Sequence, residues 1–439
     1  MVNFIKTLSI HKLGNILFFT GLFFLASAVG VSIIFLLISV IISFLNYKDF
    51  LKDRWNYPFI FCSLFMIIST FIHFENSKNP VFYEIDPTLS IIGLTNWIPF
   101  FLSFWGFQKY LNSPQKRILA GKILIFGSLP VIFSGILQIQ NINGPFELFN
   151  GLIVWFQKPL SDVGSLSGLF NNQNYAGLWM VMIWPFCLSE LQNKYDLFYK
   201  KVVIILICIL FATFIFLTDS RNAILGLIIS SPIVLGSGIL IWYIPLVITS
   251  LILLAITILP IIPYSTQNLM KSIIPSRIYT LFPEIGFEYI NSYPRINKWW
   301  SALNYVLSKP IFGWGAASFP IIYQYKSGEW FGHAHNLPLE LAVSYGIMPS
   351  IIIFTTYLAL LYFSFKHIFN PNKKTHNKYI SCYQRAWFAS SLIFFISHLF
   401  DIQYFDARIS IICWIMLAGL RSFIKEENFK KENNFLFKK

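Results

Sequence analysis

Charged residues are scarce in this sequence: Asp, Glu, Lys and Arg make up 12% of the 439 residues, whereas hydrophobic residues make up 56%. A soluble globular domain of ordinary composition carries about 25% charged residues. The low charged fraction therefore excludes a typical soluble enzyme. Apolar runs of about 18 or more residues recur along the chain, and each is long enough to cross a bilayer. The sequence predicts an all-α, polytopic integral membrane protein.

Cysteine patterns that would indicate a function are also missing. The chain has 5 cysteines, no C-x-x-C motif and no cysteine pair in a long polar loop. Neither a disulfide framework nor a thiolate metal site is indicated. The first apolar stretch is not followed by a small-residue cleavage site, so we expect no removed signal peptide.

The apolar runs predict about 12 transmembrane helices within a single membrane domain that covers residues 1–439. Their boundaries carry an error of a few residues. The predicted spans are 14–28, 30–46, 56–74, 90–108, 118–138, 174–191, 202–218, 222–237, 239–260, 337–366, 386–402 and 408–424.

The net charge of +14 follows the predicted topology. Lys and Arg concentrate in the loops on the side of the N-terminus, and acidic residues are more frequent on the opposite side. This bias is typical of bacterial inner-membrane proteins, whose positive loops stay in the cytoplasm. We therefore expect both termini in the cytoplasm, and the excess charge indicates topology rather than nucleic-acid binding.

Two predicted outer loops are longer than the other connections: residues 261–336, by far the longer of the two, and residues 139–173. A loop of this length in a compact protein is usually functional. Within it, "PRINKWWSALNYVLSKP" predicts an amphipathic helix between Pro294 and Pro310 that lies on the membrane. Its apolar positions recur at spacings of three and four: Ile296, Trp299, Trp300, Leu303 and Leu307.

Two arginines stand at the beginnings of predicted outer-side helices. Arg221 lies in "LTDSRNAILG", and Arg295 directly follows Pro294. Free backbone N–H groups at a helix N-terminus and a guanidinium can converge on an anion, so the pair is suited to bind a diphosphate. The alternatives are an ion pair with Asp219 or snorkelling for Arg221, and contact with lipid headgroups for Arg295.

His333 and His335 lie in "FGHAHNLPLELAVSYGIMPS", at the edge of a predicted span. Two residues apart, they would share one face of an extended segment and could hold a metal with Glu329 or Glu340. Because no third ligand recurs at a usable spacing, we expect no metal. His335 could also cap the helix that follows.

Other polar residues on the same predicted side complete the candidate site. Asn336 immediately precedes Leu337 and Pro338, which predicts a helix cap. Asp401 is one helical turn from His398, and the two could simply satisfy each other. Asn172 and Asn174 carry amides suited to sugar hydroxyls, although Asn is common in turns for backbone reasons alone.

These segments resemble the O-antigen ligase and O-antigen polymerase superfamily of lipid-linked glycan transferases. "HAHNLPLELAVSYGIMP" is similar to its His–Asn pair followed after nine residues by Gly, here Gly346. "DSRNAILG" resembles a Ser-Arg-x-Ala segment, and "INKWWSALNYVLSKPIFGWGAASF" resembles a Trp followed by Pro-x-x-Gly-x-Gly. "GLFNNQNYAGL" resembles Phe-x-Asn-Pro-Asn-x-x-Ala with Gln173 at the usual proline, and Pro349 replaces a residue that is often small. The strongest likeness covers 165–350.

The resemblance implies a metal-independent glycosyltransferase whose active site faces the periplasm and which needs no cofactor. Its donor would be an undecaprenyl-diphosphate-linked glycan. The acceptor would be a lipid A-core sugar in a ligase, our first expectation, or another lipid-linked glycan in a polymerase. His335 would be the base and Arg221 and Arg295 would bind the diphosphate. The other substrate-binding residues would be His333, Asn336, Asn172, Asn174 and Asp401.

Two functions of other classes remain as alternatives. Some relatives in cyanobacteria have been described as bicarbonate transporters, so a solute transporter is one. Transporters usually place ionisable groups near the middle of the membrane, often in repeated halves. This chain has no such halves and gathers its polar groups at one membrane edge. The other alternative is an inactive scaffold in a polysaccharide assembly complex.

Overall fold

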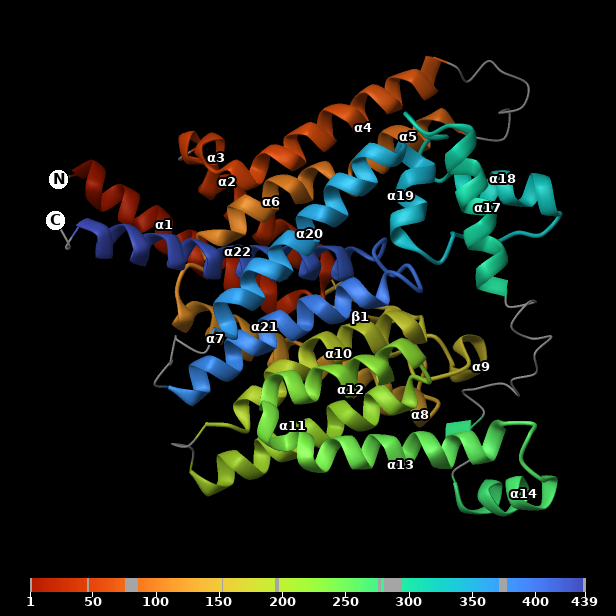
Figure 1. Cartoon of the computed structure of the whole chain (residues 1–439). Helices are drawn as coiled ribbons and strands as arrows, with labels where there is room; N and C mark the ends of the chain where they lie inside the picture. The colour runs from red at the N-terminus through yellow and green to blue at the C-terminus, as the bar shows by residue number, and fades with distance from the viewer. Residues whose placement is uncertain are drawn as a thin grey trace.

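The computed structural model of the chain is an assembly of α-helices, as expected (Figure 1). It describes residues 2–45, 47–75, 86–151, 153–193, 197–274, 278–279, 294–370 and 377–436. The strands within these ranges are β1 (Phe146–Leu148) and β2 (Ile153–Trp155), which pair antiparallel with Glu147 opposite Val154. This small hairpin lies in the 139–173 loop and was not predicted from the sequence.

The helices follow one another along the chain with mostly short connections. Up to the end of the 139–173 loop they are α1 (Val2–Phe24), α2 (Val29–Phe44), α3 (Lys48–Lys52), α4 (Tyr57–Glu75), α5 (Pro87–Leu94), α6 (Ile98–Gln108), α7 (Pro114–Gly127), α8 (Leu129–Ile139) and α9 (Leu160–Val163). The later ones are α10 (Gln173–Glu190), α11 (Phe198–Leu217), α12 (Arg221–Leu235), α13 (Leu240–Ile258), α14 (Tyr264–Ile273), α17 (Pro294–Ser308), α18 (Ser318–Ser327), α19 (Leu337–Tyr345), α20 (Ile347–Ile368), α21 (Lys378–Ser397) and α22 (Ala407–Leu436). The 3-10 helices within the described ranges are η1 (Arg54–Asn56), η4 (Gly168–Phe170) and η5 (Ser237–Ile239).

Among the described residues, seven helical segments are long and apolar enough to cross a membrane: Arg54–Phe74, Thr88–Gln108, Pro114–Ile139, Phe198–Leu217, Ser237–Ile258, Ile347–Ile368 and Ala407–Glu426. Shorter apolar helices are Ile10–Phe24, Val29–Phe44 and Arg221–Leu235. With α10 and α21 added, each predicted span overlaps a helix. The polytopic, all-α architecture predicted from hydropathy is therefore confirmed.

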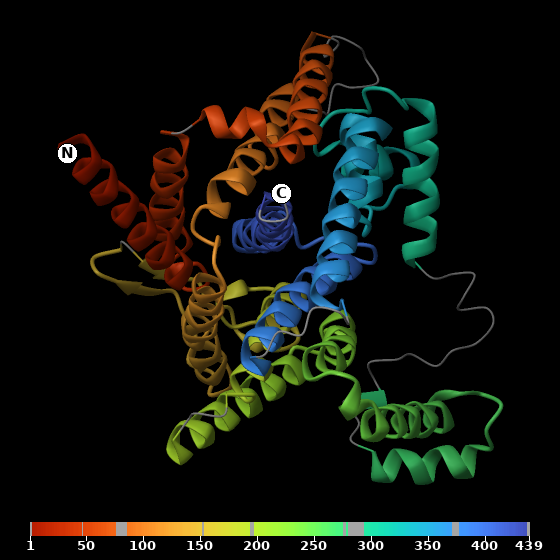
Figure 2. The ribbon, with the colours of Figure 1, turned by 60° about the vertical axis from the view of Figure 1, so that its left-hand side comes forward.

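The interior is built around the C-terminal helix. In the segment Ala407–Glu426, 89% of the most apolar window is buried, whereas none of the window in Ser237–Ile258 is buried. Figure 2 shows α22 nearly end-on, surrounded by other helices, while α13 lies at the periphery. Helix α22 packs on α6, α20 and α21, and α21 packs on α10 and α12. The arrangement brings the start of α22 next to the starts of α10 and α12 and to the end of α21.

The predicted span 337–366 is wrong as a single helix. It is divided into α19 and α20 at Gly346, whose φ of +90° is unfavourable for an L side chain. A Cβ at Gly346 would lie 1.9 Å from the carbonyl oxygen of Ile311. The amide of Ile347 donates to the carbonyl of Pro310 over 2.9 Å. The Pro-x-x-Gly-x-Gly segment thus packs backbone against backbone on the end of α19, and α19 becomes a separate helix of nine residues.

The helix predicted between Pro294 and Pro310 is confirmed as α17, and it has two apolar faces. One face packs on α18 and α19 through the buried residues Ala302, Tyr305 and Val306. The opposite face is exposed and carries the predicted apolar positions Ile296, Trp300, Leu303 and Leu307. The described part of the 261–336 loop also contains α14 and α18, whereas residues 280–293 lie outside the described residues. Helix α17 therefore packs the 261–336 loop against α19.

Candidate functional site

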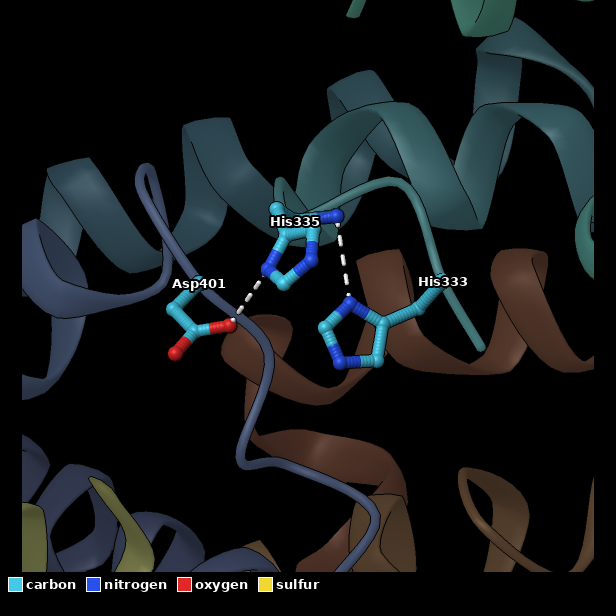
Figure 3. A group of neighbouring side chains, drawn as sticks. All are labelled: His333, His335 and Asp401. Carbon is cyan, nitrogen blue, oxygen red and sulfur yellow. Dashed lines mark hydrogen bonds and ion pairs between the residues drawn. The ribbon is translucent and has the colours of Figure 1, made fainter. Parts of the chain in front are cut away.

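His335 and Asp401 form the centre of the candidate site. The Nδ1 atom of His335 lies 2.8 Å from Oδ1 of Asp401 (Figure 3). Their side chains are 23% and 6% exposed, so the imidazole can be reached from outside while the carboxylate is enclosed. His335 belongs to the turn before α19, and Asp401 belongs to the loop between α21 and α22. Two segments distant in the chain thus supply one hydrogen-bonded pair.

The state of Asp401 determines the tautomer of His335. Burial tends to raise the pKa of the Asp401 carboxyl, but the hydrogen bond from His335, the electrostatic interaction with the two nearby imidazoles and the backbone bond from Ile402 outweigh it. The pKa therefore lies below its usual value, and the carboxylate is ionised and can only accept hydrogen bonds. Nδ1 of His335 must carry the hydrogen, which leaves the lone pair of a neutral imidazole on Nε2. A carboxylate that orients an imidazole in this way is a recurring arrangement around catalytic bases.

Asp401 is itself held by its own loop. Its Oδ1 also accepts the amide hydrogen of Ile402 over 2.9 Å, and its Oδ2 accepts from Nε2 of Gln403 over 3.0 Å. The alternative that Asp401 and His398 satisfy each other is wrong. Nδ1 of His398 instead lies 2.9 Å from the carbonyl oxygen of Phe394. The carboxylate is therefore fixed toward His335 by three bonds that do not involve His398.

His333 packs against His335 and is neutral. The ring centroids are 4.3 Å apart, and the backbone amide of His335 donates to Nδ1 of His333 over 3.2 Å (Figure 3). Burial, followed by the charges of His335, Lys298 and Arg295, lowers the pKa of His333 to about 4, with Asp401 opposing. Because Nδ1 accepts, the hydrogen of the neutral ring is on Nε2. His333 therefore helps to fix the backbone of His335, which has an unusual φ of +53°.

The turn that carries His335 is anchored on both sides. Asn336 caps α19 as predicted, because its Oδ1 accepts the amide of Leu339 over 2.9 Å. Its Nδ2 donates to the carbonyl of Leu399 over 2.9 Å, and the amide of Leu337 donates to the carbonyl of His398 over 2.9 Å. These bonds join the start of α19 to the Asp401 loop. The observed bonds of Asn336 thus stabilise the start of α19 and its contact with the Asp401 loop.

Glu340 adds a second anchor that sequence reasoning did not identify. It is buried in α19, and its Oε2 accepts the amide hydrogen of Ala334 over 2.8 Å. Burial raises the pKa of Glu340 to about 7, and the bond from Ala334 opposes this shift. Ala334 lies between the two histidines, so Glu340 positions the segment that carries both rings.

Lys298 is a second residue that the sequence reasoning missed. It is 4% exposed, and its Nζ lies 3.2 Å from the centroid of the Phe331 ring. Burial lowers the pKa of Lys298, and Arg295 lowers it further, while Glu329 and Asp401 oppose this effect. Lys298 lies one helical turn after Arg295 on α17, and this spacing was the available signal, because residues three apart share a helix face.

The two predicted arginines occupy helix N-termini, at different places around the cluster. Arg295 is half-buried in the first turn of α17, and its charge acts on His333 and Lys298. Arg221 is exposed and begins α12. A small cavity lined by Asn222, Ile396 and Ser397 marks where α12 meets the end of α21. Arg221 therefore lies at the same edge of the helical bundle as the loop that carries Asp401.

Asn172 and Asn174 lie at the start of α10. Oδ1 of Asn172 accepts the amides of Asn174 and Tyr175 over 2.9 Å and 3.3 Å, so Asn172 is the helix cap. Tyr175 is within electrostatic range of Asp401. A Cβ on Gly177 would lie 2.8 Å from Cβ of Ser220, which shows how closely the start of α10 approaches the start of α12. Both asparagines are thus near the site, and Asn172 has a structural role in addition.

His333, His335 and Asp401 also form the one cluster of potential metal ligands found among the described residues, with ligand atoms within 4.8 Å of one another. Asp401 therefore takes the place of Glu329 or Glu340 as the third potential ligand. In the observed arrangement, however, Nδ1 of His335 and Oδ1 of Asp401 are bonded to each other. A metal on these two atoms would have to break that bond.

The comparison with known protein families matches the region of the chain that contains most of the candidate site. The model of the O-antigen ligase family matches residues 206–354, which include Arg221, Arg295, His335 and Gly346. The resemblance indicated by the sequence motifs is therefore confirmed. None of the curated proteins compared with the chain matches it.

Proposed function

We propose that this chain is a membrane glycosyltransferase of the O-antigen ligase or polymerase type, and that it transfers a glycan from an undecaprenyl-diphosphate-linked donor to an acceptor sugar. The observation that carries the proposal is the bond between His335 and Asp401. It leaves Nε2 of an oriented, accessible imidazole free to take a proton. The family match supports the reaction class, and this geometry supports the mechanism.

In the proposed reaction, Nε2 of His335 removes the proton from a hydroxyl of the acceptor sugar. The acceptor oxygen then attacks the anomeric carbon of the donor, and the bond from that carbon to the diphosphate oxygen breaks. The products are the new glycosidic bond, undecaprenyl diphosphate and protonated His335. Asp401 keeps the ring oriented and stabilises its positive charge.

The leaving diphosphate needs cations, because its negative charge develops as the bond breaks. Arg295 supplies one from the first turn of α17, and Arg221 supplies another from the first turn of α12. At both places free backbone N–H groups favour an anion. No metal ion is required in this proposal, because the arginines replace it as the electrophilic group.

The transporter alternative receives less support from the geometry. His333, His335 and Asp401 precede or follow helices rather than lie within the described membrane-length segments. Transporters commonly place such groups near the middle of the bilayer. Deletion of the gene should therefore change surface glycan and leave inorganic-carbon uptake unchanged.

The same deletion separates the two enzymatic forms of the proposal. A ligase is supported if long chains disappear from the lipid A core and lipid-linked polymer accumulates. A polymerase is supported if single-repeat glycans remain on the lipid A core. An unchanged surface polysaccharide in the deletion strain would contradict both.

A further inference from the structure

A cavity of about 260 Å³ lies beside the start of α22. Three separate segments enclose it: residues 26–31, which form the α1–α2 turn and the first residues of α2, the end of the β-hairpin at 153–156, and Asp406–Arg408. Leu169 and Asn171 complete its wall. We propose that this cavity binds a sugar ring of a glycan substrate, at a distance from the reacting unit. The inference rests on the proposed function and adds a second subsite to it.

The aromatic part of the wall suits the C–H face of a sugar. Trp155 is half-buried, and its Nε1 donates to the carbonyl of Ser27 over 2.8 Å, which fixes the indole against the α1–α2 turn. Phe156 is 63% exposed. A fixed indole beside an exposed phenyl ring offers apolar contact area without burying unsatisfied polar groups.

The polar part of the wall is held in place and has no net charge. Arg408 donates from Nε to Oδ1 of Asp406 over 2.9 Å and from NH1 to the carbonyl of Leu169 over 2.8 Å. Its guanidinium carbon lies 3.8 Å from the centroid of the Phe170 ring. Because the carboxylate neutralises the guanidinium, the pair favours neither an anion nor a cation. It does offer fixed hydrogen-bonding groups for hydroxyls.

Asn171 extends this hydrogen-bonding set. Its Oδ1 accepts the amide hydrogen of Lys158 over 3.0 Å, which orients the side chain and leaves an NH₂ group with two donor hydrogens. A neutral wall of aromatic rings, amide and paired charges matches a polyhydroxyl ring. It suits an acyl chain less well, because polar groups would be buried without partners. A phosphate would lack an unpaired cation.

The position of the cavity connects it to the candidate active site. Asp401 and Asp406 belong to the same loop, and the charges of both act on Tyr175. Five residues span at most about 18 Å when fully extended. A short oligosaccharide could therefore reach from the cavity to His335. All three enclosing segments belong to the side predicted to be periplasmic, where such a glycan would be present.

Gly30 allows a test that fills the cavity without disturbing the fold. Gly30 lines the cavity, and a Cβ added there meets no atom within 4 Å. Gly238 is equally open but lies in η5, outside the cavity, so Gly238→Trp is the matched control. The assay is transfer by the purified full-length chain with lipid-linked donor and acceptor, with KM measured for each substrate.

Gly30→Trp should raise KM for one glycan substrate by about tenfold or more and leave kcat nearly unchanged. The substrate whose KM rises is the one that occupies the cavity. Gly238→Trp should behave like the natural chain. Unchanged KM values for both substrates, or a fall in kcat alone, would overturn the inference.

A binding measurement separates failure of this inference from failure of the proposed function. The probe is the oligosaccharide mixture released by mild acid from the lipopolysaccharide of the host strain, titrated onto the full chain in nanodiscs. Binding should weaken about tenfold in Gly30→Trp and persist in His335→Asn. Equal binding by the natural chain and Gly30→Trp would reject the cavity even if transfer is never observed.

Discussion

Asp401 lies 66 residues after His335 in the chain, and its Oδ1 is 2.8 Å from Nδ1 of the imidazole. The contact joins the loop after α21 to the turn before α19 and determines which ring nitrogen is free. Asp401→Asn keeps the size of the side chain but removes its charge. The transfer rate should fall by about 10²- to 10⁴-fold with little change in KM, because an amide does not stabilise the protonated ring.

The control for Asp401→Asn is Glu147→Gln, which neutralises an exposed carboxylate on β1. Both variants should accumulate in the membrane to the same level as the natural chain. Full transfer activity in Asp401→Asn would mean that the carboxylate has no part in orienting the base.

The arginines should be sensitive to a change that keeps their charge. Arg221→Lys and Arg295→Lys lose the planar fork that binds a diphosphate through two parallel bonds. Each should reduce transfer by about tenfold or more at normal protein level. Arg54→Lys, at an exposed position in η1, is the control. If both Lys variants kept full activity, the alternatives would remain: an ion pair with Asp219 or snorkelling for Arg221, and contact with lipid headgroups for Arg295.

Glu340 predicts a pH dependence of stability with a defined sign. Burial raises its pKa from 4.5 to about 7, so the folded protein holds this proton more tightly than the unfolded chain does. The resulting contribution to stability is complete below pH 4.5 and is lost as the pH rises through about 7. Its size is about 3 kcal/mol.

Glu340→Gln is neutral at every pH and should remove this dependence. Between pH 5 and pH 8, the Tm of the natural chain should fall relative to that of Glu340→Gln. Thermal unfolding in detergent, with Glu147→Gln as the control, measures the difference. Parallel curves for the natural chain and Glu340→Gln would show that the buried carboxyl is not protonated near neutral pH.

Much of the fold could be predicted because apolar runs reflect local composition. Each predicted span overlaps a helix, and the cap at Asn336 and the start of α17 at Pro294 follow from short sequence patterns. The break at Gly346 could not be predicted in this way, since the apolar run continues across it. It results from the close approach of Ile311, which is a tertiary contact.

In the candidate site, too, local features could be predicted and tertiary contacts could not. Arg295 could be predicted from its place at a helix start, and His335 from its place at the edge of a span and from the His–Asn motif, which are local features. The partner of Asp401 was uncertain because His398 is near in sequence, whereas His335 is adjacent only in the folded chain. The bond between the amide of Ala334 and the carboxyl of Glu340 likewise forms only in the folded chain. Its role depends on the turn before α19, which no local pattern encodes.

The predicted topology gives an independent test through cysteine labelling. The five natural cysteines are buried, so the labelling signal should come from the single introduced cysteine. Lys326→Cys in α18 should react with an impermeant reagent from the periplasm, and Lys378→Cys at the start of α21 should react only from the cytoplasm. Both positions are exposed. Labelling of Lys326→Cys from the cytoplasmic side alone would reverse the assignment.

The central claim is that His335, oriented by Asp401, acts as the base without a metal ion. His335→Asn tests it with least disturbance, because Asn tolerates the positive φ of this position but has no basic nitrogen. The measurement is transfer by purified protein with lipid-linked donor and acceptor in the presence of EDTA. The natural chain should remain active, His335→Asn should be inactive, and His333→Ala should lose less activity. Activity of the natural chain that vanishes with EDTA and returns with a divalent ion would contradict the claim and favour a metal on His333, His335 and Asp401.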